Sequence, residues 1–184
     1  MISIRSEQAR DVSAREVLLD DVFGFDRHEK TCERLREGRM PAQGLSLIAD
    51  DHGAVVGTVR LWSIEIGGDM ALLLGPLAVS ASHQARGLGG RLMRAALNRA
   101  SSQGYQAIIL VGDARYYERF GFSATVMAGI DLPGPVDRHR FLGLELKPGA
   151  LSQRNGTVRA TGEPSMIRAC PAGKGDASPI ARAA

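Results

Sequence analysis

The hydrophobic pattern near the N-terminus predicts one strand followed by two helices. Apolar residues at positions 2 and 4 alternate with polar neighbours, as in a half-buried strand, and those between positions 12 and 23 recur at helical spacing. A charged segment, 28–39, predicts a second, short helix that ends near Gly38 and Pro41. The chain is therefore expected to begin in the order strand, helix, helix.

Three strands joined by short turns are expected next. The segments 45–50, 54–66 and 70–79 are rich in apolar and β-branched residues. The turn residues Asp51-His52-Gly53 and Gly67-Gly68-Asp69 separate them. Such closely spaced strands pair with their sequence neighbours, so we expect an antiparallel meander.

The period of the pattern then changes from that of strands to that of a helix. The segment 87–103 predicts an amphipathic helix that stops at Gly104. A short strand at 106–111, a helical turn at 113–119 and a strand at 141–146 complete the pattern. The residues of the expected apolar face are Leu88, Leu92, Met93, Ala96, Leu97 and Ala100.

This order of elements indicates an α+β (mixed α/β) domain. One crossover helix joins two parallel neighbours beside the meander, which gives a mixed, mostly antiparallel sheet flanked by helices. We assign the domain to residues 1–146 and an extension with one edge strand at 157–160 to residues 147–161. Residues 162–184 are expected to form a flexible tail, because glycine, alanine, proline and serine replace the apolar periodicity.

Composition and charge exclude several classes of protein. No apolar run is long enough to span a membrane, and the charged N-terminus lacks the core of a signal peptide, so a soluble cytoplasmic protein is expected. Cys32 and Cys170 lie too far apart to suggest a disulfide framework or a metal site. The net charge of +3 divides into −1 for residues 1–146 and +4 for residues 147–184. A basic tail on a neutral body argues against a nucleic-acid partner.

Three glycines at the start of the amphipathic helix are the strongest chemical signal. Gly87, Gly89 and Gly90 follow a strand and a polar loop, where the free N–H groups of a helix's first turn can hold a phosphate. The alternative is a tight strand-to-helix joint without a ligand. A dinucleotide-binding fingerprint is excluded because position 92 is leucine, and a P-loop is excluded because the only Lys-Thr pair, Lys30-Thr31, follows Glu29 where that motif needs glycine.

Two motifs give the chain a specific resemblance. Residues 84–89, QARGLG, match the Q/R-x-x-G-x-G/A element of the GNAT N-acetyltransferases, and residues 112–122, GDARYYERFGF, resemble that family's Y-x-x-x-G-F segment. The resemblance spans residues 2–146. The second motif, together with the segments LGPLAV and FLGLELKPGAL, makes the chain similar to a bacterial subgroup of predicted N-acetyltransferases.

The resemblance implies the GNAT fold with acetyl-CoA as its cofactor. It implies that the strand 75–79 splays from its neighbour to bind the pantetheine arm and that the glycine loop binds the pyrophosphate. Tyr117 is implied to protonate the leaving thiolate, with Tyr116 as a packing residue and a backbone N–H near Leu77 or Ala78 as oxyanion donor. The implied cofactor-binding residues are Leu77, Ala78, Val79, Gln84, Ala85, Arg86, Gly87, Leu88, Gly89, Gly90 and Tyr117.

The general base is less sharply indicated. Glu65, on the strand before the splayed one, is the candidate, and the alternative is a solvated strand carboxylate. His83 is expected at the surface, Asp113 as the cap of its helix, and Trp62 in the core or in the wall of an acceptor pocket.

The sequence therefore predicts an acetyl-CoA-dependent N-acetyltransferase. The acetyl group would pass directly to a primary amine, of a small molecule or a peptide, in a ternary complex. The alternative is a non-catalytic acyl-CoA sensor with the same fold. We expect the acceptor pocket in the N-terminal helices and near residues 129–137, and the oligomeric state stays open between a monomer and a homodimer.

Overall fold

A mixed β-sheet organises the computed structural model, which describes residues 1–29 and 31–165. The strand order is β1-β2-β3-β4-β5-β7, with β9 paired to β3 outside that path. Among the described strands of this sheet, β4 and β5 pair in parallel and the others antiparallel. The strands are β1 (Ser3–Ser6), β2 (Ser46–Asp51), β3 (Ala54–Ile66), β4 (Asp69–Val79), β5 (Ala107–Val111), β7 (Phe141–Glu145) and β9 (Arg159–Ala160).

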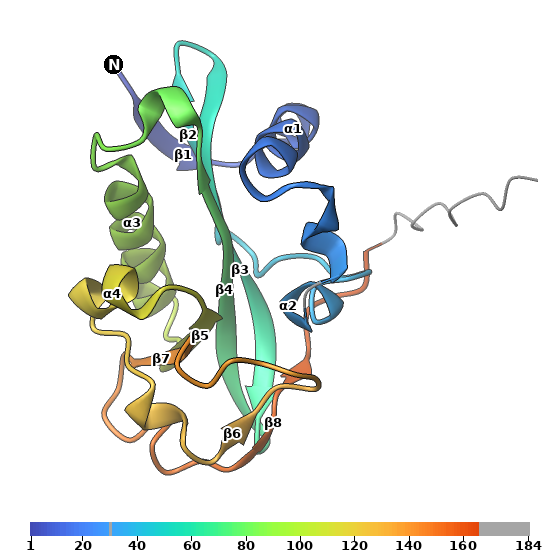
Figure 1. Cartoon of the computed structure of the whole chain (residues 1–184), viewed down its shortest axis with the longest axis vertical. Coiled ribbons are helices and arrows are strands. Elements are labelled where there is room, and N and C mark those ends of the chain that lie inside the picture. The colour runs from blue at the N-terminus through green and yellow to red at the C-terminus, as the bar shows by residue number, and fades with distance from the viewer. Residues whose placement is uncertain (30, 166–184) are drawn as a thin grey trace, which may run out of the picture.

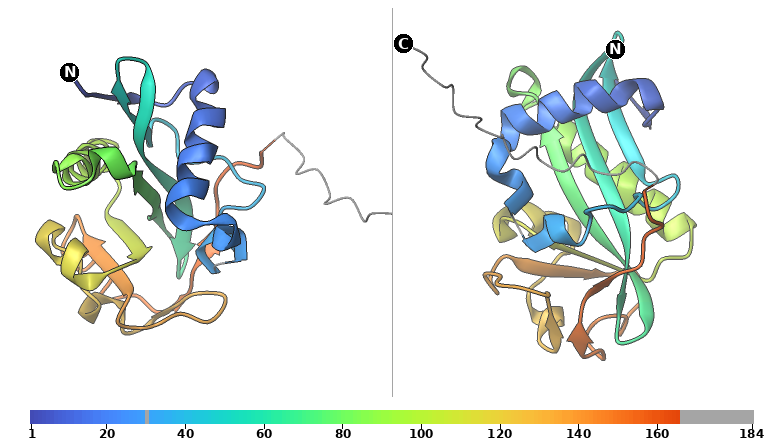
Figure 2. Two further views of the ribbon diagram at one scale, coloured as in Figure 1. Left: turned by 45° about the horizontal axis from the view of Figure 1, so that its top comes forward. Right: turned by 90° about the vertical axis from the view of Figure 1, so that its right-hand side faces the viewer.

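Helices cover both faces of this sheet. Figure 1 shows α1 (Val12–Phe23) and α2 (Thr31–Arg34) on one face, and α3 (Leu88–Ser102) and α4 (Ala114–Tyr117) on the other. The right-hand view of Figure 2 shows α1 lying across the strands. Short 3-10 segments join these elements: η1 (Ala9–Asp11), η2 (Phe25–Glu29), η3 (Ala81–His83), η4 (Glu118–Phe120) and η5 (Thr125–Met127).

Alternation along β3 supplies the cores on both faces, because successive side chains of a strand point to opposite sides. Val59 and Leu61 pack in the core under α3, whereas Ile64 and Ile66 pack in the core on the other face. The predicted apolar face of α3 is confirmed, since Leu88, Leu92, Met93, Ala96 and Ala100 are buried. The meander and the parallel pair joined by a crossover helix are confirmed as well.

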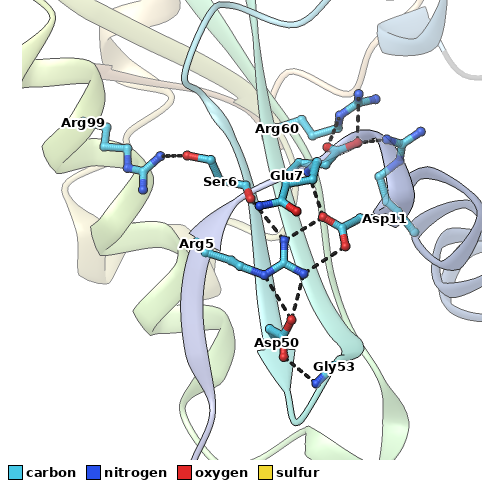
Figure 3. Close-up of polar contacts among 10 residues, drawn as sticks. Arg5, Ser6, Glu7, Asp11, Asp50, Gly53, Arg60 and Arg99 are labelled. Carbon is cyan, nitrogen blue, oxygen red and sulfur yellow. Dashed lines mark hydrogen bonds and ion pairs between the residues drawn. The ribbon is translucent and has the colours of Figure 1, made fainter.

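Ion pairs fasten the N-terminal segment to the sheet (Figure 3). The guanidinium of Arg5 donates to Asp11 and Asp50, with Nη1–Oδ2 and Nη2–Oδ2 distances of 2.6 and 2.7 Å. Glu7 lies between Arg60 and Arg15, and all three side chains are largely buried. Helix α1 is therefore held by charge pairs as well as by the apolar contacts that its sequence predicted.

The expected helix at 28–39 is wrong in extent. The chain forms η2 and the four-residue α2, and i→i+3 bonds such as Arg36 N to Glu33 O and Arg39 N to Arg36 O follow. These turns lead the chain from the helical face to β2.

The C-terminal segment pairs further than expected. The predicted edge strand at 157–160 divides into β8 (Gly156–Thr157), which pairs with β6 (Ile130–Asp131), and β9, with the buried Val158 between them. Residues 162–165 then lie along 38–40, where the Met40 N–H donates to the Glu163 carbonyl at 2.7 Å. The expectation of a flexible tail from Gly162 is wrong for these residues, and its remainder, with Cys170, lies outside the described residues.

Within residues 1–29 and 31–165, no helix is long and apolar enough to cross a membrane. The same part of the chain contains no group of three or more His, Cys, Asp or Glu side chains that could hold a metal ion.

Candidate active site

A cleft of about 820 Å³ opens where the second half of β4 leaves its neighbour β5. The second half of β4 forms the floor of the cleft. The segment from the end of α1 to residue 36 forms one wall, and residues 132–140 form another. Gln84, Gly89, Tyr116 and Tyr117 close the remaining side. The cleft thus joins parts of the chain that the sequence associated with both the cofactor and the acceptor.

The separation of β4 from β5 exposes backbone groups to the cleft. The two strands pair only at Leu72↔Ile108 and Leu73↔Ile109, although β4 continues to Val79. On the other side, β4 stays paired to β3 across an irregularity between the Leu61↔Leu74 and Val59↔Leu77 pairs. The edge of residues 75–79 that faces away from β3 therefore offers its N–H and C=O groups to a ligand.

Gly75, at the irregularity, is fixed from two sides. The indole Nε1–H of Trp62 donates to its carbonyl at 2.7 Å. A Cβ on Gly75 would lie 3.0 Å from Nη2 of Arg36, and its φ of +124° favours glycine. Trp62 is 6% exposed, so it is a core residue that positions the cleft floor.

The glycine loop forms an uncapped helix start. Gly87 is the N-cap of α3 with φ of +70°, and it has no side chain to occupy the first N–H groups of the helix. Ala85 also has a positive φ of 60°, so two left-handed residues orient this loop. Free N–H groups at the positive end of a helix dipole suit a phosphate. The residues of this loop therefore fit the phosphates of coenzyme A.

Gly87 and Gly89 serve different purposes. A Cβ on Gly87 would meet nothing within 4 Å, so the space beside it is open. A Cβ on Gly89 would lie 2.6 Å from the hydroxyl of Tyr116, so this glycine admits the tyrosine against α3. The open space beside Gly87 is compatible with a ligand there, whereas the close approach of Tyr116 to Gly89 is that of a structural joint. Arg94 lies beside Gly90 and adds positive charge nearby.

Tyr117 lies in the cleft with a hydroxyl that keeps its proton. Its ring contacts Gly112 and stands edge-on to Tyr116 and Phe122, with ring centroids 4.9 and 5.9 Å away. Burial raises the pKa of Tyr117 to about 12, against a usual value of 10. The group is consequently a proton donor at neutral pH and a poor base.

Two further sequence predictions concern the loops beside the cleft. Asp113 caps α4 as expected, because its carboxylate accepts from the Arg115 N–H at 3.1 Å. His83 is not a free surface residue: its side chain is 15% exposed and its Nε2 lies 3.3 Å from Asp51 Oδ2. His83 instead ties the glycine loop to the turn between β2 and β3.

The position of Glu65 argues against its expected role as a base. Glu65 pairs with Met70 near the β3–β4 turn and lies 3.9 Å from Arg159. It does not line the cleft. The cleft floor begins opposite Leu61, roughly 13 Å away along the strand. The alternative of a solvated strand carboxylate describes this residue.

Sequence reasoning missed the charged residues of the cleft wall. Glu33 and Arg36 lie there, joined by an ion pair of 3.2 Å, and Arg140 faces them from the other wall. They belonged to segments in which no motif or periodicity separates cleft from surface. Cys32, also in the wall, has a pKa raised by burial, which keeps its thiol protonated.

Of the predicted cofactor residues, the structure brings one group into the cleft and places the others beside it. Leu77, Ala78, Val79, Gln84, Gly89 and Tyr117 line the cleft. The remaining ones form the adjoining loop and helix start, namely Ala85, Arg86, Gly87, Leu88 and Gly90.

The chain also matches known proteins in sequence. Residues 42–124 match the model of the acetyltransferase (GNAT) domain. The chain is 30% identical over 157 residues to the uncharacterized N-acetyltransferase YhbS of Escherichia coli K12, covering 84% of this chain and 93% of that protein. It is 34% identical over 104 residues to the uncharacterized N-acetyltransferase YjhQ of the same organism, covering 54% of this chain and 58% of that protein.

Solved structures of related proteins resemble the whole fold. The crystal structure of YhbS in complex with CoA has a TM-score of 0.74 and 29% identity, over 87% of this chain and 89% of that one. A GNAT acetyltransferase from Brucella melitensis in complex with acetyl-CoA has a TM-score of 0.65 and 26% identity, over 88% and 96% of the two chains. The sequence and structural matches together show that the chain belongs to the GNAT acetyltransferase family.

Proposed function

We propose that the protein transfers the acetyl group of acetyl-CoA to a primary amine by direct attack in a ternary complex. The observation that carries the proposal is the open edge of β4 beside the uncapped start of α3, with Tyr117 facing the same cleft. Relatives of the same fold were solved with CoA and with acetyl-CoA.

The chain supplies distinct groups for the two ends of such a cofactor. The backbone of Leu77–Val79 would hold the pantetheine arm, and the N–H groups from Gln84 to Gly90 would hold the pyrophosphate. When bound, acetyl-CoA supplies an activated thioester carbonyl.

The residues around the reacting atoms have separate tasks. Tyr117 holds a proton at its hydroxyl oxygen and can release it to the leaving sulfur. A backbone N–H near Leu77 or Ala78 would donate to the oxygen on which negative charge develops, a contribution of about 3 kcal/mol for donors of this kind. The amine must arrive as the free base, because only its lone pair can attack.

The replacement Tyr117→Phe tests the proposal, because it removes the proton donor and keeps the ring. Release of coenzyme A with a panel of amines should fall at least tenfold, since positioned acids contribute roughly 10²–10⁴-fold. The affinity for acetyl-CoA, measured by calorimetry, should stay within twofold. Tyr105→Phe is the matched control, because Tyr105 lies outside the cleft beside the far end of α3.

The pH profile provides a second measurement. A Tyr117 pKa of about 12 keeps the donor protonated up to about pH 10, so the rate of the wild type should not decline with the titration of this group below that pH. Binding of acetyl-CoA without turnover of any amine would instead support the acyl-CoA sensor.

A further inference from the structure

Arg36 presents hydrogen-bond donors that have no acceptors among the described residues. Its side chain is 11% exposed, and only Nη1 donates to a described acceptor, Oε2 of Glu33 at 3.2 Å. Its Nε is buried without a hydrogen-bond partner among the described residues. Its Nη2 lies against the Cα of Gly75 in the cleft floor. A guanidinium with one edge unsatisfied is costly to bury.

The location of Arg36 relates this edge to the reacting groups. Gly75 is two residues from Leu77 along β4. The positive charges of Arg36 and Arg140 both act on Tyr117, so the three side chains face a common space. An acceptor whose amine lay between Leu77 and Tyr117 would place its next few atoms beside Arg36.

The other charged groups of the cleft differ in their availability: Asp113 caps α4, whereas Arg140 is a second, exposed cation. Arg27 is paired with Asp20 and Glu16, which removes it from the set of available cations. Glu33 offers a carboxylate within the same wall, and Asp137 and Arg140 lie in the opposite wall. Around them the lining is apolar, with Phe23, Leu132 and Val136.

We propose that the acceptor is an amine with a carboxylate one or two carbons away, as in a free amino acid, and that the Arg36 guanidinium binds this carboxylate. The inference rests on the proposed function and names the second substrate of the same site. A planar guanidinium edge matches a carboxylate with two parallel hydrogen bonds. Glu33 accepts a hydrogen bond from the ammonium group of the acceptor, which releases one proton to solvent water before the free amine attacks. The apolar lining contacts the side chain of the acceptor.

Matched acceptors test the inference directly. The twenty free amino acids are compared with their amides and with the corresponding amines that lack the carboxyl group, by thiol detection with acetyl-CoA. The amide is the weaker base and is more deprotonated at neutral pH, so intrinsic reactivity favours it. We expect at least one free amino acid to have a kcat/KM roughly tenfold or more above its amide, as one charge-assisted pair gives.

The variant Arg36→Gln should abolish this preference. The KM of the free amino acid is expected to rise about tenfold or more, whereas the KM of its amide changes less than twofold. Arg34→Gln is the matched control, because Arg34 lies two residues before Arg36 but is exposed and outside the cleft. If Arg36→Gln does not fold, the preference of the wild-type protein for free amino acids over their amides still tests the inference.

The outcomes separate this inference from the proposed function. If the amides or the amines that lack the carboxyl group are acetylated at rates equal to or above those of the matched amino acids, the inference is overturned. The acetyltransferase proposal then stays intact. Without any turnover the acetyltransferase proposal fails, and binding of N-acetylphenylalanine and of N-acetylphenethylamine to the protein with coenzyme A is measured by calorimetry. The inference is supported if N-acetylphenylalanine binds more tightly than N-acetylphenethylamine and if Arg36→Gln removes this difference. Equal binding of the two compounds overturns it.

Discussion

Single carboxylates hold loops of this protein in place, and Glu145 is the clearest case. Its carboxylate accepts from the backbone N–H groups of Gly149, Leu151 and Ser152 at 3.0, 2.8 and 2.7 Å. These bonds, led by the one from Ser152, lower the pKa of Glu145 to about 2. The anion therefore organises the turn that follows β7.

We predict that Glu145→Gln destabilises the fold by about 1–3 kcal/mol at pH 7, the range for a lost bond to a charged group. The folded-state pKa is depressed, so the stabilisation is present above about pH 4.5 and is lost as the pH falls toward 2. Denaturant unfolding at several pH values measures it. Glu37→Gln, at an exposed position, should change the free energy of unfolding little. An equal loss of stability in both variants would contradict the prediction.

The positions of residues within a local sequence motif could be predicted, whereas those of residues that depend on long-range contacts could not. Tyr117, the glycine loop and the Asp113 cap each lie in a local pattern whose geometry the backbone enforces. Glu65 was assigned from its strand alone, but its distance from the cleft depends on the register of β3 with β4. Arg36 depends on a turn that brings it onto Gly75, which no local pattern reveals.

At the scale of elements, the two ends of α3 provide a matched pair of glycines. Gly87 and Gly104 both have positive φ, +70° and +83°, and a Cβ on either would meet nothing within 4 Å. Substitution therefore strains the backbone similarly, by roughly 1–2 kcal/mol for a left-handed residue. Only Gly87 belongs to the proposed phosphate site.

We predict that Gly87→Val weakens acetyl-CoA binding more than tenfold, whereas Gly104→Val leaves the affinity within twofold. Both variants should unfold cooperatively with similar losses of stability. Calorimetric titration with acetyl-CoA and denaturant unfolding provide the two measurements. Equal affinities of the two variants would show that the glycine loop is only a structural joint.

Long periodic elements could be predicted, whereas short paired segments could not. The β2-β3-β4 meander and α3 have many residues in one period, and their bounds agree with the sequence to within a residue or two. The two-residue strands β6 and β8 depend on each other across the chain, so neither has a pattern of its own. The segment 28–39 has a helical composition, but the turns that follow Glu33 interrupt it.

At the scale of the molecule, residues 161–165 attach the segment that follows Arg36 to β3. Thr161 and Gly162 donate from their N–H groups to the Ser63 carbonyl of β3, and Arg39 donates to the Gly162 carbonyl at 2.7 Å. A Cβ on Gly162 would lie 2.9 Å from the Met40 carbonyl. The segment that follows Arg36 is thus held to the sheet by residues near position 162.

We predict that Gly162→Val loosens this attachment and affects the two substrates unequally. The KM of the amine should rise severalfold, because the wall with Glu33 and Arg36 loses its support, while the affinity for acetyl-CoA stays within twofold. Steady-state kinetics and calorimetry measure these effects. Glu163→Gln, at an exposed neighbour, serves as the control, and a parallel loss of both affinities would contradict the prediction.

Because β4 separates from β5, the groups proposed to bind the acetyl donor and the walls of the cleft come from different stretches of the sequence. The groups proposed for the donor lie in one continuous stretch, from the open strand edge to Tyr117, whereas the opposing walls come from residues 22–36 and 132–140. Changes in those walls can accumulate without disturbing the thioester side. The same donor-binding residues can therefore serve different amines. We expect sequence differences among relatives to concentrate in the two walls.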